Sequence, residues 1–401
     1  MKTVLAYSGG LDTSFCVKWI QENYKSDVIT VTLDVGQGKD LTEIGRRAEA
    51  LGVLKHYSLD VKEEFAEGYV FSAIRANALY EGVYPLHSAL SRPLIASKLV
   101  EIAEKEGAEA VAHGCTGKGN DQVRFDVTIK SLAPDLKIIA PIRESNMSRD
   151  MEVAYLKKLG LEAEISSGSE YSIDQNLWGR SIECGPLEYM EKEPPEAEVF
   201  KWTKPIEETP DKPDYIDVEF VNGVPVAFNG SNMGPVNLLE KLNHIASEHG
   251  IGRIDHVEDR LVGIKSREVY ECPVATLIIT AHKDLEKTVL TRHEVFFKQI
   301  VDAKWAELVY TGLWMDPLRE DLDAFIAETQ KRVEGVVKLK LFKGSVRVVG
   351  RSSSYSIYDQ NLATYNVDTT FNQKAALGFI ELWGLPTTTA RSLKKKSKLG
   401  D

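Results

Sequence analysis

The first 165 residues alternate short β-branched runs with stretches of helical periodicity, and this alternation constrains the fold more than any other feature. Strands separated by helices form βαβ units, whose right-handed crossovers place helices on both faces of a parallel sheet. The sequence therefore predicts an N-terminal doubly wound α/β domain. Its expected strands are 3–7, 28–35, 56–61, 108–113 and 137–140, and its expected helices include 41–51, 62–80 and 94–105.

The second half of the chain lacks this regular alternation. Residues 191–214 carry five of the 15 prolines among many charged residues, which predicts a surface connection that contains neither a buried strand nor a helix. The elements expected beyond it are strands at 215–221, 260–265, 276–280, 336–341 and 345–349, and helices at 235–248 and 318–333. Together they predict an α+β second domain.

The last forty residues contain a helical pattern over 373–383 and then a basic run, 391–398. An apolar helix this late in the chain cannot easily reach a core that is already closed. We therefore expect the helix to take part in subunit contacts. A charge run of this kind is more often a solvated tail than a nucleic-acid site, so we assign it no chemistry.

Charge and cysteine content exclude several classes of function. The formal net charge is −11, from 49 Lys and Arg against 60 Asp and Glu, so no overall positive field would attract a nucleic-acid backbone. The four cysteines show neither CxxC spacing nor a zinc pattern, which favours a reduced cytoplasmic protein. We also find neither a signal peptide nor an apolar stretch that approaches 18 residues, so we expect a soluble chain without a membrane partner.

A glycine-rich turn, Ser8-Gly9-Gly10-Leu11-Asp12-Thr13-Ser14, directly follows the first expected strand and precedes an apolar helix pattern. Glycines let the backbone approach a phosphate, and the amides and dipole of a helix start favour an anion. Asp12 would repel phosphate unless it holds a magnesium ion, caps the helix or orients a donor. The alternative is an ordinary βα turn, and the Walker and GxGxxG patterns are absent.

This turn resembles the pyrophosphate loop of the N-type ATP pyrophosphatases over all seven residues. The resemblance implies that ATP is cleaved between its α and β phosphates, and that the loop holds the departing pyrophosphate while a substrate oxygen attacks the α-phosphorus. The implied ATP contacts are Ala6, Tyr7, Ser8, Gly9, Gly10, Leu11, Asp12, Thr13, Ser14, Leu33 and Gly114. Leu33 departs from the family, which often has alanine there.

A second cluster, Gly114-Cys115-Thr116-Gly117-Lys118-Gly119-Asn120-Asp121-Gln122-Val123-Arg124-Phe125, follows another expected strand. If a helix begins near Gly119, Asn120 and Arg124 lie at i and i+4 on one face. A guanidinium pairs well with a carboxylate, Asp121 can hold an ammonium, and Thr116 can donate to a second carboxylate. The spacing therefore favours amino-acid substrates, the alternative being a solvent-facing helix start with an internal ion pair.

This second cluster resembles the signature of the argininosuccinate synthase family, G-x-T-x-K-G-N-D-x-x-R-F, at every specified position. Further matches extend over nearly the whole chain and include segments 78–84, 171–177, 252–258 and 265–271. The resemblance implies a ligase that joins citrulline to aspartate through a citrullyl-adenylate and releases AMP and pyrophosphate. It also implies ATP as co-substrate, Mg²⁺ and a homotetramer.

The same resemblance implies the substrate contacts. Citrulline would be bound by Tyr84, Asn120, Arg124, Ser172, Ser181, Glu258 and Tyr270, and aspartate by Thr116, Asn120 and Asp121. Asp121 is the nearest candidate catalytic residue, because the attacking amine must be oriented and must lose a proton. Ala89 stands where the family has a serine, so a hydroxyl contact to citrulline is lost or moves to Ser88.

The organisation that follows is a nucleotide-binding domain over 1–165, a synthetase domain over 166–360 and an oligomerisation segment over 361–401. Two other functions stay open. A tRNA-thiolating member of the same group would need a basic RNA face and usually a catalytic cysteine, for which Cys115 lies in a suggestive place, but the acidic net charge argues against it. A non-enzymatic nucleotide sensor would not require the residues between Glu258 and Tyr270.

Overall fold

The computed structural model describes residues 1–145, 147, 149–161 and 170–397. Residues 1–355 form one compact unit, and residues 356–401 form a second. The expected domain boundary between residues 165 and 166 lies outside the described residues. Lys398, at the end of the basic run, also lies outside them.

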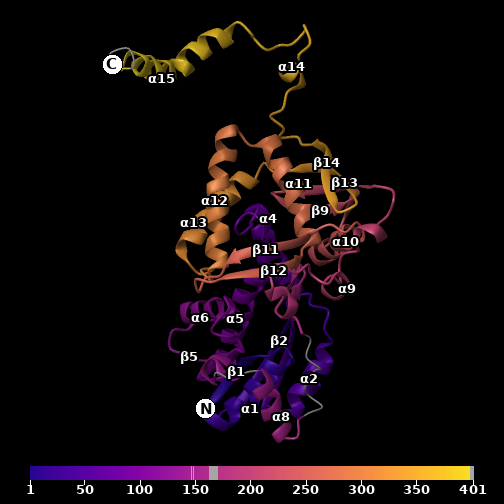
Figure 1. Ribbon diagram of the computed structural model, residues 1–401, viewed down its shortest axis with the longest axis vertical. Helices are drawn as coiled ribbons and strands as arrows, with labels where there is room; N and C mark the ends of the chain where they lie inside the picture. Colours follow the sequence, from indigo (N-terminus) through magenta and orange to yellow (C-terminus); the bar gives the residue numbers. More distant parts are fainter. Residues whose placement is uncertain (146, 148, 162–169, 398–401) are drawn as a thin grey trace. The chain divides into compact units, whose positions relative to one another are not determined.

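The N-terminal sheet is parallel and has the strand order β3-β2-β1-β4-β5 (Figure 1). Its strands are β1 Lys2–Ala6, β2 Asp27–Asp34, β3 Lys55–Asp60, β4 Ala110–Ala112 and β5 Lys137–Ile139. All five strands expected from the sequence are confirmed. The strand order reverses between β1 and β4, and in open α/β sheets the crevice beyond the strand ends at such a switch point is the usual ligand site.

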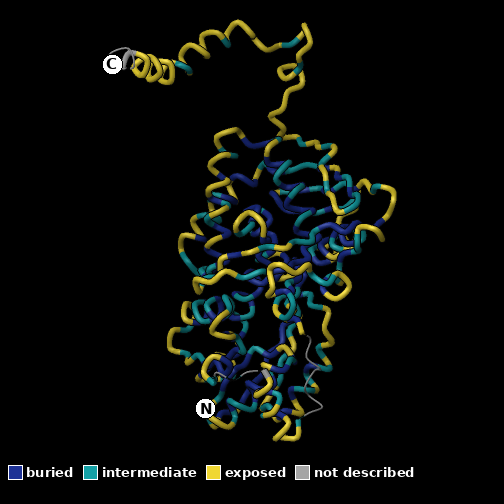
Figure 2. Tube along the Cα trace, in the orientation of Figure 1, coloured by how far each residue is buried: buried dark blue, intermediate teal, exposed yellow. Residues whose placement is uncertain are grey.

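Helices cover both faces of this sheet, because successive residues of a strand point to opposite faces. On the Leu5 face, α1 (Leu11–Tyr24), α2 (Leu41–Ala50) and α8 (Arg149–Lys158) contribute to one apolar cluster. On the Val4 face, α5 (His87–Glu106) and α6 (Asp121–Leu132) contribute to another. Figure 2 shows the buried residues concentrated inside these layers. The fold class is therefore the predicted doubly wound one.

The helix expected over 62–80 is shorter and is divided. It consists of α3 (Lys62–Phe65), a π-helical turn (Ala66–Val70) and α4 (Phe71–Arg75). It ends before Asn77, whose φ of +43° cannot continue a right-handed helix. The helix expected over 94–105 lies within α5, and α7 (Pro141–Ser145) follows β5.

Residues beyond 171 form two antiparallel sheets. One has the order β10-β9-β8-β13-β14, with α10 (Pro235–Glu248) and α11 (Pro273–Val289) packed on it. Its strands are β8 Asp214–Val221, β9 Val224–Phe228, β10 Ser231–Asn232, β13 Gly335–Phe342 and β14 Ser345–Ser352. The helices α12 (Arg292–Tyr310) and α13 (Pro317–Gln330) pack against each other. The strands expected at 215–221, 336–341 and 345–349 and the helices at 235–248 and 318–333 are confirmed.

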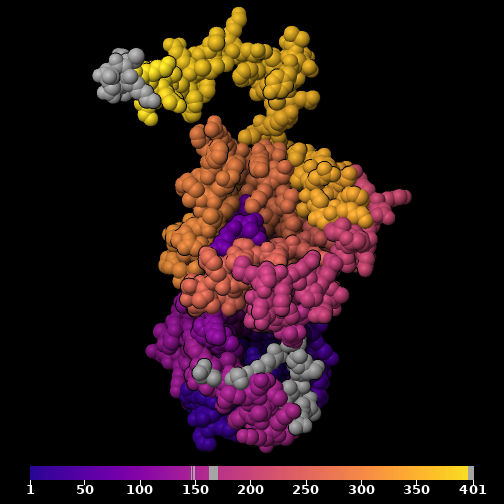
Figure 3. Space-filling view, in the orientation of Figure 1, coloured from indigo at the N-terminus to yellow at the C-terminus, as the bar shows by residue number. Residues whose placement is uncertain are grey.

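The other sheet has the order β11-β12-β7-β6. Its strands are β6 Ser172–Asn176, β7 Gly179–Glu183, β11 Arg253–Asp259 and β12 Lys265–Glu271. It joins the N-terminal sheet directly, since the Leu177 amide donates to the Val35 carbonyl at 3.0 Å and Gln175 Nε2 donates to the Gln37 carbonyl at 2.6 Å. Figure 3 shows the surfaces of the N-terminal half and of the following segment adjoining each other.

Two strand predictions in the second half are wrong. Residues 260–264 form the turn between β11 and β12, closed by a hydrogen bond from the Arg260 amide to the Ile264 carbonyl at 2.8 Å and by Gly263 at φ +86°, and Lys265 begins β12. Residues 276–280 lie inside α11 although four of the five are β-branched. Thr276 and Thr280 donate their hydroxyls to the carbonyls four residues earlier, at 2.8 and 2.7 Å, so both hydroxyls are paired within the helix.

The connection over 191–214 contains two short helical turns, α9 (Glu196–Val199) and a 3₁₀ turn (Ile206–Glu208), so the expectation of no helix is wrong. Another 3₁₀ turn, Gly185–Glu188, precedes it. The connection is also more than a surface segment. The amides of Trp202 and Thr203 donate to the buried Glu271 carboxylate at 2.9 and 2.8 Å and so hold the segment against β12.

The C-terminal unit contains α14 (Gln360–Ala363) and α15 (Ala375–Ser397), which confirms the helix expected at 373–383. Large apolar side chains of α15 are exposed, among them Leu377, Ile380, Leu382 and Trp383. Neither α15 nor any other helix in the described part of the chain combines the length and the apolar character that a membrane crossing requires.

Candidate active site

The glycine loop, residues 7–13, runs from the end of β1 into the first turn of α1 and presents backbone groups. Gly10 is the N-cap of α1, so the amides of residues 11–13 precede the first helical hydrogen bond, from Ser14 to the Gly10 carbonyl at 3.0 Å. Gly9 has φ +72°, and an added Cβ would approach Ile44 Cγ1 to 3.0 Å. Amides at a helix start that have no partner in the helix favour a bound anion.

The side chains of the loop are small, and Asp12 is the one acidic member. Ser8 Oγ lies 3.2 Å from Thr13 Oγ1, which also donates to the Gly10 carbonyl at 3.3 Å. The Asp12 side chain is exposed and accepts no hydrogen bond from the residues that the structure describes. Since Gly10 caps the helix, two of the three expected roles stay open for Asp12: holding magnesium or orienting a donor.

A cleft of about 690 Å³ faces the carboxyl ends of β1, β2 and β4. Of the residues expected to contact substrate, it is lined by Ala6, Tyr7, Ser8, Gly10, Leu11, Asp12, Thr13, Leu33, Gly114, Asp121 and Ser172. Lys39 and Arg92 add positive charge, and residues 171–175 of the β6 segment form the opposite wall. Its volume falls within the range of about 300–1,000 Å³ that is usual for ligand sites.

Nine expected residues do not line this cleft. Six of them belong to the groups described below, which are Tyr84, Asn120, Arg124, Ser181, Glu258 and Tyr270, and the other three are in or near the two motifs. Gly9 is buried beneath the loop against Ile44. Ser14 is also buried, with its Oγ 3.3 Å from the Tyr7 hydroxyl. Thr116 lies in an exposed turn before α6.

Asp121 opens α6 and lies between two arginines. Its Oδ2 accepts from Arg92 Nε at 2.8 Å, and its Oδ1 accepts from Arg124 Nη1 at 2.9 Å. Burial would raise the pKa of Asp121, but the guanidinium groups of Arg92 and Arg124 outweigh burial and lower the pKa to about 2. A carboxylate with this pKa is charged and only weakly basic at neutral pH, so its surroundings favour orienting an amine over accepting its proton.

Arg92 also links the two halves of the cleft. Its Nη2 donates to Asp174 Oδ2 on β6 at 2.7 Å while Nε holds Asp121 on α6. Asp174 Oδ2 in turn accepts from the Ser88 hydroxyl at 2.5 Å. These groups are called the Asp121 cluster below: Arg92, Asp121, Arg124 and Asp174.

Next to the Asp121 cluster, four expected citrulline contacts form one hydrogen-bonded network through Tyr310. Asn120 Nδ2 donates to the Tyr310 hydroxyl at 2.9 Å, and Arg124 Nε donates to the Tyr310 carbonyl at 3.0 Å. The hydroxyls of Tyr310 and Tyr270 each donate to Glu258, at 2.6 Å. Burial raises the pKa of Glu258, and the two tyrosine hydrogen bonds oppose that rise.

Tyr84 and Ser181 lie at the border of this network. The Tyr84 ring stacks on Tyr270 with centroids 4.5 Å apart, and its hydroxyl accepts from the Ser88 amide at 3.1 Å. Ser181 Oγ donates to the Asp174 carbonyl at 3.4 Å. Ala89 is buried and carries no hydroxyl. The hydroxyl of the neighbouring Ser88 donates to Asp174.

Sequence reasoning missed Arg92, Asp174, Glu183 and Tyr310. Arg92 and Asp174 stand in segments that resemble the family, but no pattern gave them a role. Burial and then the Glu268 carboxylate raise the pKa of Glu183 to about 7, although Arg260 lies 2.7 Å from Glu183. Tyr310 ends α12, a helix that was not expected, so only the fold could reveal it.

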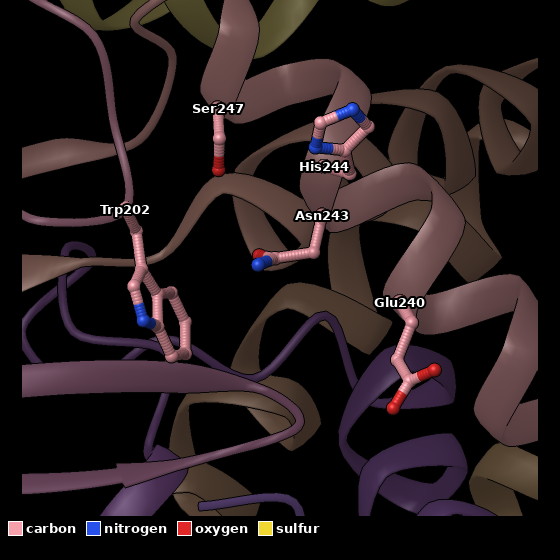
Figure 4. A pocket seen from close by; sticks show the side chains of 5 residues that line it. All are labelled: Trp202, Glu240, Asn243, His244 and Ser247. Atoms are coloured by element: carbon pink, nitrogen blue, oxygen red, sulfur yellow. The ribbon is translucent and has the colours of Figure 1, made fainter. Parts of the chain in front are cut away.

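A second, shallower pocket of about 290 Å³ lies between α10 and the connection over 191–214 (Figure 4). It is lined by Trp202 from the connection and by four residues of α10, which are Glu240, Asn243, His244 and Ser247 (Figure 4). It contains neither a glycine loop nor an ion-paired cluster. The site chemistry is therefore concentrated in the larger cleft.

A parallel sheet with an anion-binding loop at its switch point, facing a cluster of buried charged side chains, defines an α/β enzyme that binds a nucleotide beside polar substrates. Two family models match the chain: "Arginosuccinate synthase N-terminal HUP domain" over residues 2–162 and "Arginosuccinate synthase C-terminal domain" over residues 171–390. The chain belongs to the argininosuccinate synthase family and is an ATP-dependent ligase.

Curated relatives agree over nearly the full length. The argininosuccinate synthase of Bacillus licheniformis is 57% identical over 398 residues, which cover 99% of this chain and 98% of the relative. That of Pyrococcus furiosus is 56% identical over 393 residues, which cover 98% and 95%. A solved 4-thiouridine synthetase with RNA and ATP is similar over 41% of this chain and 42% of its own, at 19% identity and a TM-score of 0.31, too low to carry an argument.

Proposed function

We propose that the chain joins citrulline to aspartate at the expense of ATP and releases argininosuccinate, AMP and pyrophosphate. The observation that supports this most is the single cleft in which the glycine loop faces Asp121 and Arg92. Such a ligase must hold nucleotide phosphates beside the carboxylate and ammonium groups of two amino acids, so that the reacting atoms meet in one geometry. The cleft combines both kinds of group.

In the first step, the ureido oxygen of citrulline attacks the α-phosphorus of ATP, and the bond from that phosphorus to pyrophosphate breaks. The amides of residues 11–13 and the dipole of α1 stabilise the departing charge. The implied ATP contacts are those of the glycine loop together with Ala6, Ser14, Leu33 and Gly114. Tyr84, Asn120, Arg124, Ser172, Ser181, Glu258 and Tyr270 bind citrulline.

A magnesium ion is expected to accompany ATP. Among the described residues, no three His, Cys, Asp or Glu side chains form a metal-binding group, so protein ligands alone would not hold it there. The exposed carboxylate of Asp12 fits a site that is completed by phosphate oxygens and water, which is the usual manner of binding Mg²⁺. When bound, the ion supplies charge neutralisation to the phosphates.

In the second step, the aspartate amine attacks the ureido carbon, and the carbon–oxygen bond to AMP breaks. AMP therefore leaves with the former ureido oxygen. Thr116, Asn120 and Asp121 bind aspartate. Since Asp121 stays charged across the physiological range, it holds and orients the ammonium until the proton is lost.

The experiment uses the full chain with ATP, magnesium, aspartate and citrulline labelled with ¹⁸O at the ureido oxygen. During turnover, AMP is expected to form only when both amino acids are present. This AMP is expected to carry the ¹⁸O label. Unlabelled AMP would show that citrulline is not adenylated. AMP formation without either amino acid would instead indicate a nucleotide hydrolase.

A thiolating activity is the second candidate, because Cys115 lines the cleft. The substitution Cys115→Ser separates the two activities, since ligation does not use the thiol. Ligation is expected to stay within about threefold of the original rate, in line with a near-isosteric change. A loss beyond a hundredfold, with ATP binding retained, would favour sulfur chemistry.

We also propose that the protein is a cytoplasmic homotetramer. Its four cysteines are free, which suits a reducing compartment. Exposed apolar side chains on α15, and Phe296, Phe297 and Ile300 on α12, suit burial against other copies of the chain. Light scattering on the full chain and on a chain ending at residue 369 tests this. An unchanged native assembly would exclude the C-terminal unit from the contacts.

A further inference from the structure

A buried polar cluster lies away from the cleft and joins the N-terminal half to the helices α11, α12 and α13. We call it the His282 cluster, and its members are Asn77, His282, Glu286, Lys298, Asp302 and Gln330. His282, Lys298 and Gln330 are at most 1% exposed. Polar groups withdrawn from water to this degree require protein partners, so the hydrogen-bond pattern determines their protonation states.

The two carboxamides of the cluster have fixed orientations. Asn77 Nδ2 donates to Glu286 Oε2 at 2.6 Å and to Asp302 Oδ2 at 3.1 Å. Gln330 Nε2 donates to Glu286 Oε1 at 2.7 Å. A flipped carboxamide would set its oxygen against a carboxylate oxygen, and so both side chains must point their oxygens the other way.

Both of these oxygens point at His282. Its Nδ1 lies 2.7 Å from Asn77 Oδ1, and its Nε2 lies 2.8 Å from Gln330 Oε1. A neutral imidazole has a single N–H, so one of the two contacts would then place a nitrogen lone pair against an amide oxygen. Only the imidazolium donates to both.

The carboxylates of the cluster are surrounded by donors. Lys298 Nζ lies 2.9 Å from Glu286 Oε1 and 2.7 Å from Asp302 Oδ1, and it also donates to the Arg75 carbonyl at 2.7 Å. Burial raises the pKa of Asp302 to about 7, but the Lys298 ammonium and the Asn77 amide both donate to this carboxylate and favour its charged form. Two carboxylates, one ammonium and one imidazolium then give a cluster without net charge.

Burial opposes this protonation and is the largest influence on His282, whose pKa is lowered to about 4 when its charged neighbours are included. The Glu286 carboxylate acts in the other direction, and the ammonium of Lys298 and the guanidinium of Arg75 act with burial. Lys283 also lies near Glu286 and Asp302. The hydrogen-bond pattern decides between the neutral imidazole and the imidazolium, because a buried acceptor facing an acceptor leaves two polar groups unsatisfied.

The cluster also determines where a substrate-facing segment starts. Asn77 has φ +43° and directly precedes residues 78–86, which lead from α4 to α5. Within that segment the Tyr80 ring stacks on Tyr310 at 3.5 Å, and Tyr84 stacks on Tyr270 at 4.5 Å. The side chain of Asn77 is therefore the anchor of the segment that carries Tyr84.

We propose that His282 is held as an imidazolium that locks the carboxamides of Asn77 and Gln330, and that this lock makes His282 a positioning residue for the segment carrying Tyr84. The protonation state stands on the geometry alone. The effect on substrate binding rests on the proposed function, in which Tyr84 contacts citrulline.

The direct test is the protonation state in the unmodified, full-length protein. Neutron diffraction from deuterated crystals grown near pD 8, or ¹⁵N spectra of protein labelled at histidine, reports each ring nitrogen. Deuterons on both nitrogens of His282 are expected. One bare nitrogen at this pH would overturn the proposal, whatever the enzyme's activity.

A second test follows the stability difference between the original protein and His282→Gln as pH rises. A folded-state pKa above the unfolded value makes the contribution of His282 complete below about pH 6.5 and lost as pH rises toward the folded-state pKa. A neutral buried histidine gives the opposite slope, with the contribution growing between about pH 4 and pH 6.5. His244→Gln, at an exposed histidine on α10, is the matched control and is expected to show neither slope.

The positioning role is tested by kinetics. In His282→Gln the KM for citrulline is expected to rise about tenfold, while the KM for ATP and kcat stay within about twofold, since the glycine loop is not touched. A folded variant with an unchanged citrulline KM would overturn the positioning role and leave the protonation state standing. Absence of ligation in the unmodified protein would count against the proposed function alone.

Discussion

The glycine loop and the Asp121 cluster belong to one cleft, but they are built in opposite ways. The loop presents backbone amides and depends on the conformation of Gly9, whose φ is +72°. The cluster presents charged side chains in which Asp121 is paired on both oxygens, and Arg124 is almost fully buried. The contrast teaches that the loop is sensitive to an added atom, whereas the cluster is sensitive to a missing partner.

The largest effect is expected from Arg124→Ala. It leaves Asp121 with one partner and the Tyr310 carbonyl without its two guanidinium donors. Breaking a buried pair by removing one partner costs about 3–5 kcal/mol. Denaturant unfolding measures this loss.

Lys130→Ala, on the exposed side of the same helix, is the control and is expected to cost less than about 1 kcal/mol. Equal losses in the two variants would mean that the cluster is not sensitive to a missing partner. Arg124→Lys should fall between the two, because an ammonium cannot reproduce the fork that contacts Asp121 and the Tyr310 carbonyl together.

Gly9→Ala tests the other side of the comparison. The new Cβ would lie 3.0 Å from Ile44 Cγ1. The alanine would also have to keep a positive φ, which costs about 1–2 kcal/mol for a residue with a side chain. Displacement of the loop is expected to weaken transition-state binding and so to lower kcat/KM for ATP by about a hundredfold. Steady-state kinetics with varied ATP measures it.

Gly107→Ala is the matched control for Gly9→Ala. Gly107 ends α5 with φ +61°, and nothing lies within 4 Å of its added Cβ. The two variants share the backbone strain, so they are expected to lose similar stability. Only Gly9→Ala should lose ATP turnover, and an equal kinetic loss at Gly107 would assign the effect to strain rather than to the loop.

The same contrast explains how much of the molecule could be predicted. Strands β1 and β2 of the N-terminal sheet are buried on both faces, so they read as apolar β-branched runs, and the loop that follows β1 is a local motif. Residues 276–280 gave the same signal inside α11, where only the proline at its start pointed to a helix. The capping box of Thr291 and Glu294 at the start of α12 was present in the sequence and was overlooked.

Contacts within the site divide in the same way. Asn120, Asp121 and Arg124 are neighbours in the sequence, and their proximity followed from helical spacing. The partner of Asn120 is Tyr310, 190 residues away, and the partner of Asp121 is Arg92 on another helix. Such long-range pairs depend on how sheets and helices assemble, which residue spacing does not encode.

A smaller effect with a distinct pH dependence is expected from Glu183→Gln. Burial and the Glu268 carboxylate raise the pKa of Glu183 from 4.5 to about 7. Between these values the folded protein binds more protons than the unfolded protein, so the contribution of Glu183 to stability falls as pH rises through this window. The variant should remove this slope from thermal melts between pH 5 and 8. A variant with an unchanged slope would assign it to another group.

The smallest effect is expected from Ser88→Ala, which removes the hydroxyl that donates to Asp174 at 2.5 Å. Asp174 keeps Arg92 as a partner at 2.7 Å, so the loss should be about 1.5–3 kcal/mol at most, as for one hydrogen bond to a charged group. Ser97→Ala, on the same helix with its hydroxyl on the Pro93 carbonyl, is the control. If Ser88→Ala instead lowered kcat/KM for citrulline more than Arg124→Lys did, the hydroxyl would be a direct substrate contact. Citrulline would then be recognised through a neutral group beside the Asp121 cluster, and charge pairing would no longer separate this side of the cleft from the loop.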